Sequence, residues 1–319
     1  MYEQLTMAQR YTISALRKRK VSQKEIAKEI GKSQSTVSRE LARNRTKSGS
    51  YNPQLAHEMA MERRERIVSN SALEPGVLKE AIRLLTTEQW SPKQISGWLA
   101  RKGMHISHER IYQEIRNDTT GELAKHTRHN MKHRKRKCAS AGVAHIPDRV
   151  GIEQRPPEAD GTRFGDWEMD LVVDPRQRAI LTLVERKTNF GIAELLEHGK
   201  KAEPLARTVA RLLAPWRQAV LTITTDNGSE FARHALITKL LRRKSLPDVK
   251  VFFAQPYAAW QKGAVENFNG LLRQYIPKGT DFQQIDNQYV KQIQKKLNRR
   301  PRQKLDFYAP IDVFNKIFQ

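Results

Sequence analysis

The stretch that decides the class of fold is Gly165-Asp166-Trp167-Glu168-Met169-Asp170-Leu171. Acidic and apolar side chains alternate there with a period of two, which is the period of a β-strand. Asp166, Glu168 and Asp170 should therefore share one face of a strand, and the apolar residues between them the other. Three acids on one strand face repel one another unless a cation or basic groups compensate them. The stretch thus predicts a strand with one apolar face and one acidic face.

The segments that follow this strand predict an α/β domain. Three β-rich runs separated by short breaks suit an antiparallel meander, and helical and strand-like patterns then alternate up to a helix that contains Glu266. The expected elements are strands over residues 165–175, 179–187 and 189–198, a helix over 202–216, a strand over 220–225, a helix over 229–244 and a strand over 249–253. This order predicts an α/β domain with a mixed sheet over residues 161–319, which includes a C-terminal helix over about 286–298.

Residues 1–48 predict a helix-turn-helix domain made of three short helices. Thr6 and Ser22 suit the caps of the first two helices, because their hydroxyls can accept hydrogen bonds from backbone N–H groups. Gly31 ends the second helix, where a residue that tolerates positive φ is expected. The third helix begins near Ser33 and is rich in small polar and basic side chains, which can approach the base edges of DNA. Its candidate DNA contacts are Ser33, Gln34, Ser35, Thr36, Arg39 and Arg43. An ordinary three-helix bundle is the alternative.

Residues 49–118 predict a charged connecting helix over 53–68 and a second, weaker helix-turn-helix-like unit. The unit begins with a helix over 75–87. Ser91-Pro92 then has the cap-then-proline order that favours a helix start, and a third helix covers about 107–117. His108 and Arg110, at the start of this third helix, are candidate DNA contacts. A three-helix scaffold without a role in DNA binding is the alternative here.

Residues 119–160 predict a basic linker with little apolar periodicity, which could follow a phosphate backbone. Its candidate DNA contacts are Lys132, Arg134, Lys135 and Arg136. The whole chain is basic as well, with 58 Lys and Arg against 34 Asp and Glu and a formal net charge of +24. Such a charge favours a polyanion as partner. A ribosomal or chromatin-like protein would be equally basic, so the charge indicates a class of partner and no reaction.

Length and composition fit a multidomain protein of the cytoplasm. A chain of 319 residues is long enough for two or three domains. The mean hydropathy of −0.70 and the lack of a run of about 20 apolar residues argue against a membrane span or a membrane partner. The first residues contain no apolar signal-peptide core. The single cysteine rules out an intrachain disulfide framework and fits a reducing compartment.

Two further acids stand where an α/β domain places its chemistry. Asp226 ends the expected strand 220–225, and a carboxylate at this edge of a sheet projects into the crevice that holds most α/β sites. Glu266 lies on the last helix of the alternating series. Carboxylates are the ligands that Mg²⁺ prefers, and two such ions about 4 Å apart can activate a water or a 3′-hydroxyl for phosphoryl transfer. Taken singly, each acid also fits a surface turn or a solvated helix face, and strand alternation alone does not select Asp170 over Asp166 or Glu168.

Three segments of the chain form a specific set: Gly165-Asp166-Trp167-Glu168-Met169-Asp170-Leu171, Thr224-Thr225-Asp226-Asn227-Gly228-Ser229-Glu230-Phe231 and Gln261-Lys262-Gly263-Ala264-Val265-Glu266-Asn267-Phe268-Asn269-Gly270-Leu271-Leu272-Arg273-Gln274-Tyr275. They resemble the signature blocks of DDE transposases of the IS-thirty insertion-sequence family. The last block is the most specific, whereas a lone Asp-Asn-Gly would be a weak signal. The resemblance extends over nearly the whole chain, and it implies a catalytic domain of the retroviral-integrase type with an RNase H fold.

The resemblance implies that Asp170, Asp226 and Glu266 are the catalytic triad and the ligands of two Mg²⁺ ions, with Mn²⁺ as the alternative metal. Lys262 and Arg273 fall near this triad and are candidate DNA contacts, with packing or solvated charge as the alternative. The implied protein is a bacterial, nucleoid-associated transposase. It would bind double-stranded DNA at terminal inverted repeats, cleave the element ends and transfer the 3′-hydroxyl ends to target DNA. Because two ends must be paired, the resemblance also implies a homodimer or a larger homo-oligomer on DNA.

Two other functions fit part of the sequence. A non-catalytic helix-turn-helix DNA-binding regulator needs only the N-terminal region and the charge, but gives no reason for acids on three separate elements to converge. A structure-selective nuclease of the RNase H type explains the acids but not the paired helix-turn-helix units. Such a nuclease would cut DNA without joining it.

Overall fold

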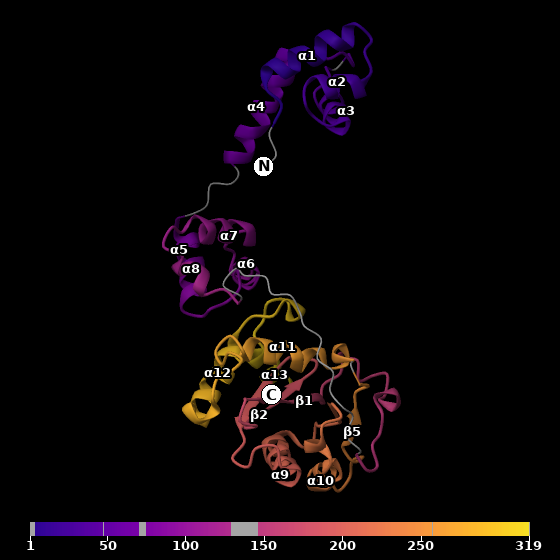
Figure 1. The fold of residues 1–319 in the computed structure, drawn as a ribbon, viewed down its shortest axis with the longest axis vertical. Helices are drawn as coiled ribbons and strands as arrows, with labels where there is room; N and C mark the ends of the chain where they lie inside the picture. Colours follow the sequence, from indigo (N-terminus) through magenta and orange to yellow (C-terminus); the bar gives the residue numbers. More distant parts are fainter. Residues whose placement is uncertain (1–3, 47, 70–74, 129–145, 257, 319) are drawn as a thin grey trace. The chain divides into compact units, whose positions relative to one another are not determined.

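The computed structural model describes residues 4–46, 48–69, 75–128, 146–256 and 258–318 (Figure 1). The chain divides into two compact units, residues 1–74 and residues 75–319. The boundary falls inside the predicted segment 49–118, because the connecting helix packs on the first helix of the chain. None of the described helices is long and apolar enough to cross a membrane. The predicted order, an all-helical region followed by an α/β domain, is confirmed.

The first unit contains the predicted helix-turn-helix. Thr6 and Ser22 cap the first two helices through capping boxes, and Ser33 caps the third. Gly31 follows the second helix with φ of +63°, a conformation that a residue without Cβ adopts at little cost. The helices are α1 (Met7–Lys18), α2 (Gln23–Glu29), α3 (Gln34–Arg43) and α4 (Pro53–Ser69). Their shared core consists of Leu5, Ile13, Ile26, Ala27, Ile30, Val37 and Leu41.

A buried ion pair fixes α1 against α3 in this unit. Arg10 Nε donates to Glu40 Oε1 over 2.8 Å, and both side chains are buried. The Tyr51 hydroxyl also donates to Glu40 Oε1, over 3.1 Å, and Arg10 Nη1 donates to the carbonyl of Leu5. A buried charge is stable only when it is paired and hydrogen-bonded, so the two helices must keep this relative position.

The second unit begins with the predicted second set of three helices. They are α5 (Pro75–Thr86), α6 (Pro92–Arg101) and α7 (His108–Asn117), followed by the short α8 (Glu122–Lys125). Ser91 caps α6 with Pro92 in the first turn, as the sequence predicts. The Arg101 guanidinium lies 3.2 Å from the centre of the Tyr308 ring and donates to the carbonyl of Phe307. These contacts attach α6 to the C-terminal segment of the same unit.

A five-stranded mixed sheet forms the centre of the second unit (Figure 1). Its strands are β1 (Asp166–Val173), β2 (Ala179–Glu185), β3 (Gly191–Leu195), β4 (Thr222–Thr225) and β5 (Lys250–Phe253). The order is β3-β2-β1-β4-β5, with β1, β2 and β3 antiparallel and β4 and β5 parallel to β1. This arrangement confirms the predicted RNase H-like domain with a mixed sheet.

Helices cover both faces of the sheet, and the alternation in β1 decides which side chains meet them. Trp167 and Met169 enter one core, which is closed by α9 (Ala202–Leu213), α10 (His234–Leu240) and α13 (Pro310–Phe318). The opposite face is covered by two further helices (Figure 1). These are α11 (Gly263–Leu272) and α12 (Asn287–Arg299). The acids of β1 therefore point toward the layer that contains Glu266.

Two segments differ from the expectation. The single helix expected over 229–244 is a short 3-10 helix, η3 (Ser229–Phe231), followed by α10, which ends at Leu240. Beyond that end, the buried Arg243 side chain donates to the carbonyls of Gln218 and Val220, at 3.1 and 2.8 Å. These tertiary hydrogen bonds need a backbone path that a continued helix would not follow. The helix α13 was not expected, although Phe314 and Pro310 on it are buried.

Candidate active site

The three acids of β1 have different surroundings. Asp166 is fully buried, accepts from Arg163 Nε at 2.7 Å, and accepts from the Thr222 hydroxyl at 2.6 Å. Glu168 is also buried, and it accepts from Arg186 Nε and from the backbone N–H of Val265, both at 2.9 Å. Two of the three acids are thus neutralised inside the fold. Their contacts hold β1 to its neighbours and to the start of α11.

Asp170 is the acid of β1 that remains open. Its side chain is 26 % exposed, and it accepts from Lys262 Nζ at 3.2 Å and from Asn269 Nδ2 at 2.8 Å. No arginine pairs with it among the described residues. Asp170 is therefore the β1 carboxylate that a ligand from solvent can reach.

Asp226 lies beside Asp170 because β1 and β4 are parallel neighbours. Their register pairs Glu168 with Thr224, so the positions two residues further along, Asp170 and Asp226, face each other at the same sheet edge. Asp226 Oδ2 lies 3.3 Å from Lys262 Nζ, and its Oδ1 accepts from the N–H of Gly228. One ammonium group therefore lies between the two carboxylates, and the sequence prediction that Asp226 projects from the strand end is confirmed.

The electrostatics of this trio follow from burial and charge. Burial raises the pKa of the Asp170 carboxyl, and repulsion from Asp226 adds to the rise, whereas Lys262 acts against it. For Lys262, burial favours a lower pKa, but the attraction of Asp170 and Asp226 outweighs burial, so the pKa is raised. The ammonium group stays protonated at neutral pH and offsets the two negative charges.

Glu266 belongs to the same face of the helical segment as the residues that touch Asp170. Lys262 and Asn269 both contact Asp170, and Glu266 lies four residues after the first and three before the second. Residues at this spacing lie on one side of a helix. Among the described residues, no three acidic, histidine or cysteine side chains are gathered closely enough to hold a metal ion. Glu266 is thus directed to the side of Asp170 without completing a three-acid cluster.

The donor atoms around the carboxylates fit a divalent cation. The amide groups of Asn269 and Asn227 donate to Asp170 and to the carbonyl of Ala254, which leaves each Oδ1 buried and without a described hydrogen-bond partner. The carboxylates of Asp170 and Asp226, and the Oδ1 of Asn269 beside Asp170, are oxygen ligands of the kind that Mg²⁺ prefers over nitrogen or sulfur ligands. The position between the two aspartates is already held by a cation, the Lys262 ammonium. The chemistry of these residues therefore fits the implied magnesium, while the described side chains do not gather three acids around one point.

The predicted DNA contacts have varied surroundings. On α3, Ser33, Gln34, Ser35, Arg39 and Arg43 are exposed and Thr36 is half-buried. On α7, His108 is exposed, while Arg110 forms an ion pair with Glu114. The linker residues Lys132, Arg134, Lys135 and Arg136 lie outside the described residues. Nothing in these surroundings tests base or phosphate contact, so these residues stay predictions.

Lys262 is buried, whereas Arg273 is half-buried. Lys262 is buried between the two aspartates, and Arg273 donates to the carbonyls of Val173 and Pro277. Sequence reasoning did not identify Asn269 as part of the site, although the period of the helix could have, because it follows Glu266 by three residues. Sequence reasoning also did not identify Arg163 and Arg186, which neutralise Asp166 and Glu168. Arg163 precedes Asp166 by three residues, outside the strand, and Arg186 follows Glu168 by 18 residues, so the alternation of the strand indicates neither pair.

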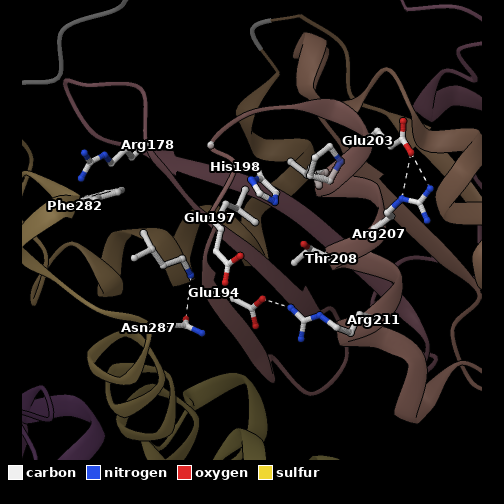
Figure 2. A pocket seen from close by; sticks show the side chains of 15 residues that line it. Arg178, Glu194, Glu197, His198, Glu203, Arg207, Thr208, Arg211, Phe282 and Asn287 are labelled. Atoms are coloured by element: carbon white, nitrogen blue, oxygen red, sulfur yellow. Dashed lines mark hydrogen bonds and ion pairs between the residues drawn. The ribbon is translucent and has the colours of Figure 1, made fainter.

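A larger hollow, of about 1050 Å³, lies at the end of β3 and the start of α9 (Figure 2). Four of its charged side chains form ion pairs with one another. Arg207 binds Glu203 at 2.8 Å, and Arg211 binds Glu194, which also accepts from Lys291. Figure 2 shows the pairs Glu203–Arg207 and Glu194–Arg211 along the wall of the hollow. These acids are held by arginines, unlike the partly exposed carboxylates of Asp170 and Asp226. The sheet edge where β1 and β4 bring Asp170 and Asp226 together is therefore the better candidate for catalysis.

Known proteins share both halves of this architecture. The pattern described as a helix-turn-helix domain matches residues 1–44. The transposase of insertion sequence element IS4351 of Bacteroides fragilis is 39 % identical over 99 % of this chain and 97 % of its own length. The transposase of IS1086 of Cupriavidus metallidurans is 35 % identical over 99 % and 95 %. The transposase InsI of IS30A of Escherichia coli K12 is 32 % identical over 98 % and 83 %.

Among solved structures, the catalytic core domain of an HTLV-2 integrase, in complex with magnesium, is 14 % identical over 46 % of this chain and 94 % of its own. Its TM-score of 0.32 is too low to add to the argument. The relatives, in contrast, match from end to end, across the helix-turn-helix, the acidic strand and the helix of Glu266. The chain belongs to the IS30 family of insertion-sequence transposases.

Proposed function

We propose that this transposase binds the terminal inverted repeats of its element, cleaves the DNA at the element ends and joins the 3′-hydroxyl ends to target DNA. The observation that carries the proposal is the meeting of Asp170 and Asp226 around one cation at the edge of the sheet, both within 3.3 Å of Lys262 Nζ. Glu266 is the third acid, on the helix face that touches Asp170. A regulator that only binds DNA has no need for this arrangement.

The carboxylates have the role of metal ligands in this proposal. Bound to Asp170, Asp226 and Glu266, two Mg²⁺ ions, or Mn²⁺ in their place, would supply activation of a water or a 3′-hydroxyl and stabilisation of the leaving oxygen. The protein contributes the positions of the ligands. Glu168 fixes the start of α11 by accepting from the N–H of Val265. Asn269 orients the Asp170 carboxylate by donating to its Oδ2.

DNA recognition is proposed for the helical regions. The exposed side chains of α3, from Ser33 to Arg43, have the polar and basic character of a recognition helix in the major groove. His108 and Arg110 on α7, Arg273 and the basic linker residues are proposed as additional contacts, chiefly to phosphates. Because two element ends must be brought together, we propose a homodimer or larger homo-oligomer on the DNA.

The test is cleavage and strand transfer on a labelled duplex that carries the element's own end, with Mg²⁺, comparing wild type with Asp226→Asn. The substitution removes a ligand charge with little change in shape, so the variant should still bind DNA but lose both reactions by at least about 100-fold. Asp248→Asn, at an exposed acid paired with Arg242, is the matched control and should react like wild type.

Three outcomes separate the competing functions. Cleavage and joining by wild type and by Asp248→Asn, but not by Asp226→Asn, support the proposal. Cleavage without joining assigns the chain to the nuclease class instead. Binding by all three proteins with no reaction, on an end that a cell-based assay shows to be mobilised by another copy, favours the regulator.

A further inference from the structure

A second feature of the second unit is a basic pocket of about 290 Å³. It is bordered by the start of α6, by one flank of α11 and by the chain that follows α12. Five of its lining side chains are cationic: Lys93, Arg128, Arg300, Arg302 and Lys304. None of the described residues that line it is an aspartate or glutamate. The pocket therefore concentrates positive charge without an internal counter-charge.

Two of these arginines are buried without an acid partner. Arg300 is 2 % exposed and donates to Gln274 Oε1 and to the Tyr275 hydroxyl, and Arg302 is 8 % exposed and donates to the carbonyl of Leu297. The Nε of each arginine is buried and has no hydrogen-bond partner among the described residues. A buried charge without a partner costs free energy, and native proteins pair nearly all such groups. The two guanidinium groups thus need an anion that does not come from the described residues around them.

Electrostatic repulsion within the pocket is a second reason to expect a bound anion. Burial lowers the pKa of Arg302 to about 9, and the positive charges of Arg300 and Arg128 contribute to the decrease. Arg302 is still protonated at neutral pH, so three guanidinium groups repel one another there. Arg128 approaches closely because Gly270 has no side chain, since a Cβ at this position would lie 2.3 Å from its Nη2. An anion among them would remove the repulsion.

The start of α6 adds a favourable dipole. Ser91, Lys93 and Gln94, the cap and first turn of this ten-residue helix, all line the pocket. A helix N-terminus carries partial positive charge and binds phosphate groups well. Leu271 and Phe307 are the apolar residues of the described lining, and its other residues are polar or cationic. The five cations and the start of α6 favour phosphate groups as ligands.

The pocket borders the same helix as the candidate active site. Asn267, Leu271 and Gln274 line it from α11 and the turn after it, and their spacing of four and three residues defines one stripe of the helix. Glu266 directly precedes the first of these residues, on the adjoining stripe. The pocket and Asp170 therefore contact different stripes of the same helical segment.

We propose that the basic pocket binds consecutive phosphate groups of the DNA strand on which the active site works. The proposal rests on the proposed DNA-joining function for its ligand. Lys93, Arg128 and Lys304 contact the phosphates from the pocket rim, and Arg300 and Arg302 provide the charge beneath them. The N-terminal end of α6 thereby acts as part of the DNA-binding surface of the catalytic domain.

The test is the salt dependence of DNA binding by the full chain, measured by fluorescence anisotropy on a duplex with the element's own end. All proteins carry Asp226→Asn so that the DNA stays intact. The protein with Asp226→Asn alone is called the parent. The rim variant carries in addition Lys93→Gln and Lys304→Gln, which remove two exposed cations at the rim of the pocket. The matched control is Lys102→Gln, Lys295→Gln, which removes two exposed lysines that do not line the pocket. Arg302→Gln probes the buried charge, with thermal unfolding measured beside it, since this variant can lose its fold.

The slope of log affinity against log salt concentration should be less steep by about 1.8 in the rim variant than in the parent, because each lost phosphate contact removes about 0.9. The slope of the control should equal that of the parent. Ethylation of one or two phosphates near the cleaved bond should weaken binding by the wild-type pocket and not by the rim variant. Equal slopes for the rim variant and the parent overturn the proposal. Protection of the chain from thermal unfolding by pyrophosphate, lost in the rim variant while the DNA slope stays unchanged, overturns it as well and assigns the pocket to a small anion.

This binding test is independent of the reaction. If the slope of log affinity against log salt is less steep in the rim variant, while wild type neither cuts nor joins DNA, the pocket proposal holds and the proposed function fails. If wild type cuts and joins but the slopes are equal, the proposed function holds and the pocket proposal fails.

Discussion

Lys262 has an unusual position for a lysine, buried between two carboxylates that both point toward solvent at the end of the sheet. Asp170 and Asp226 would otherwise face each other as like charges, which is unfavourable at this distance. Its ammonium group offsets both charges and is itself held by them. The same position is where the proposed divalent ion would need oxygen ligands. Lys262 and a metal ion therefore compete for the two aspartates.

The substitution Lys262→Gln tests this competition. Without divalent ion, the variant should be less stable than wild type by about 1–3 kcal/mol, because two acids lose their shared counter-charge. Mg²⁺ should then raise the melting temperature of the variant more than that of wild type. Differential scanning fluorimetry across a magnesium titration measures both effects, with Lys295→Gln as control. Equal magnesium responses in the variant and in wild type would show that the lysine does not compete with metal.

The choice among the three acids of β1 is testable by comparing stability with activity. Asp170→Asn should abolish cleavage and leave the melting temperature nearly unchanged, because Asp170 is partly exposed and is hydrogen-bonded mainly by the site itself. Glu168→Gln should lower the free energy of unfolding by about 3 kcal/mol, because Arg186 is left without its buried carboxylate. Calorimetry and a cleavage assay on both variants give the comparison. A stable, inactive Glu168→Gln protein would instead mark Glu168 as a ligand.

Part of the site was predictable from single residues, and part was not. Strand alternation put Asp166, Glu168 and Asp170 on one face, and the end of the next strand marked Asp226. Alternation could not tell which acid stays open, because that depends on Arg163 and Arg186. Both come from outside the strand: Arg163 precedes Asp166 by three residues in a non-helical segment, and Arg186 follows Glu168 by 18 residues, so neither pairing belongs to the strand's period of two. Only the family resemblance selected Asp170.

At the scale of elements, the helix that carries Glu266 is positioned by a close contact with β3. Gly191 lies under Phe268 of α11, and a Cβ on this glycine would come within 2.1 Å of the ring. Its backbone N–H and carbonyl also bind the side-chain amide of Asn298 on α12. The missing side chain lets both helices pack at their observed distance from the sheet.

Gly191→Ala should therefore displace α11 and with it Glu266. We expect a loss of about 1–3 kcal/mol from overpacking and a decrease in cleavage rate larger than the decrease in DNA affinity. Gly263→Ala is the matched control, since a Cβ there meets nothing within 4 Å and helix propensity favours alanine. Chemical denaturation and single-turnover cleavage would measure the two effects. Similar behaviour of the two variants would contradict the role assigned to the Gly191 contact.

Elements whose pattern is local were predicted well. The capped helices α1, α2 and α6 begin where Thr6, Ser22 and Ser91 predict, because a cap and its partner are three residues apart. The helix expected over 229–244 was too long, since its end depends on the contacts of Arg243 with carbonyls more than 20 residues away. Helix α13 was missed because its stability comes from aromatic packing of Phe314 on Trp216 and Phe190.

At the scale of the whole molecule, each compact unit has its own buried core. The first unit is small, so its single core provides limited stability, and the buried pair of Arg10 and Glu40 makes a large contribution. In the second unit, one core lies on each face of the sheet, and α5, α6 and α7 bury further apolar side chains. The two units should accordingly unfold as separate cooperative transitions.

Glu40→Gln tests this separation in the full chain. The variant leaves Arg10 buried without its carboxylate, so the first unit should lose about 3 kcal/mol and unfold at a lower temperature. The transition of the second unit should be unchanged. Circular dichroism melts combined with DNA binding at several temperatures would detect the difference, with Glu58→Gln as an exposed control on α4. A common shift of both transitions would show that the units unfold together.

The separate core of the first unit also bears on how such proteins change over generations. The exposed side chains of α3 contribute nothing to the core beneath them, and none of that core's residues belongs to the second unit. With α3 in its proposed role as recognition helix, mutations that change its exposed side chains can accumulate without disturbing the acids of the sheet. In a lineage of mobile elements, recognition of new ends can diverge quickly while the chemistry is inherited unchanged.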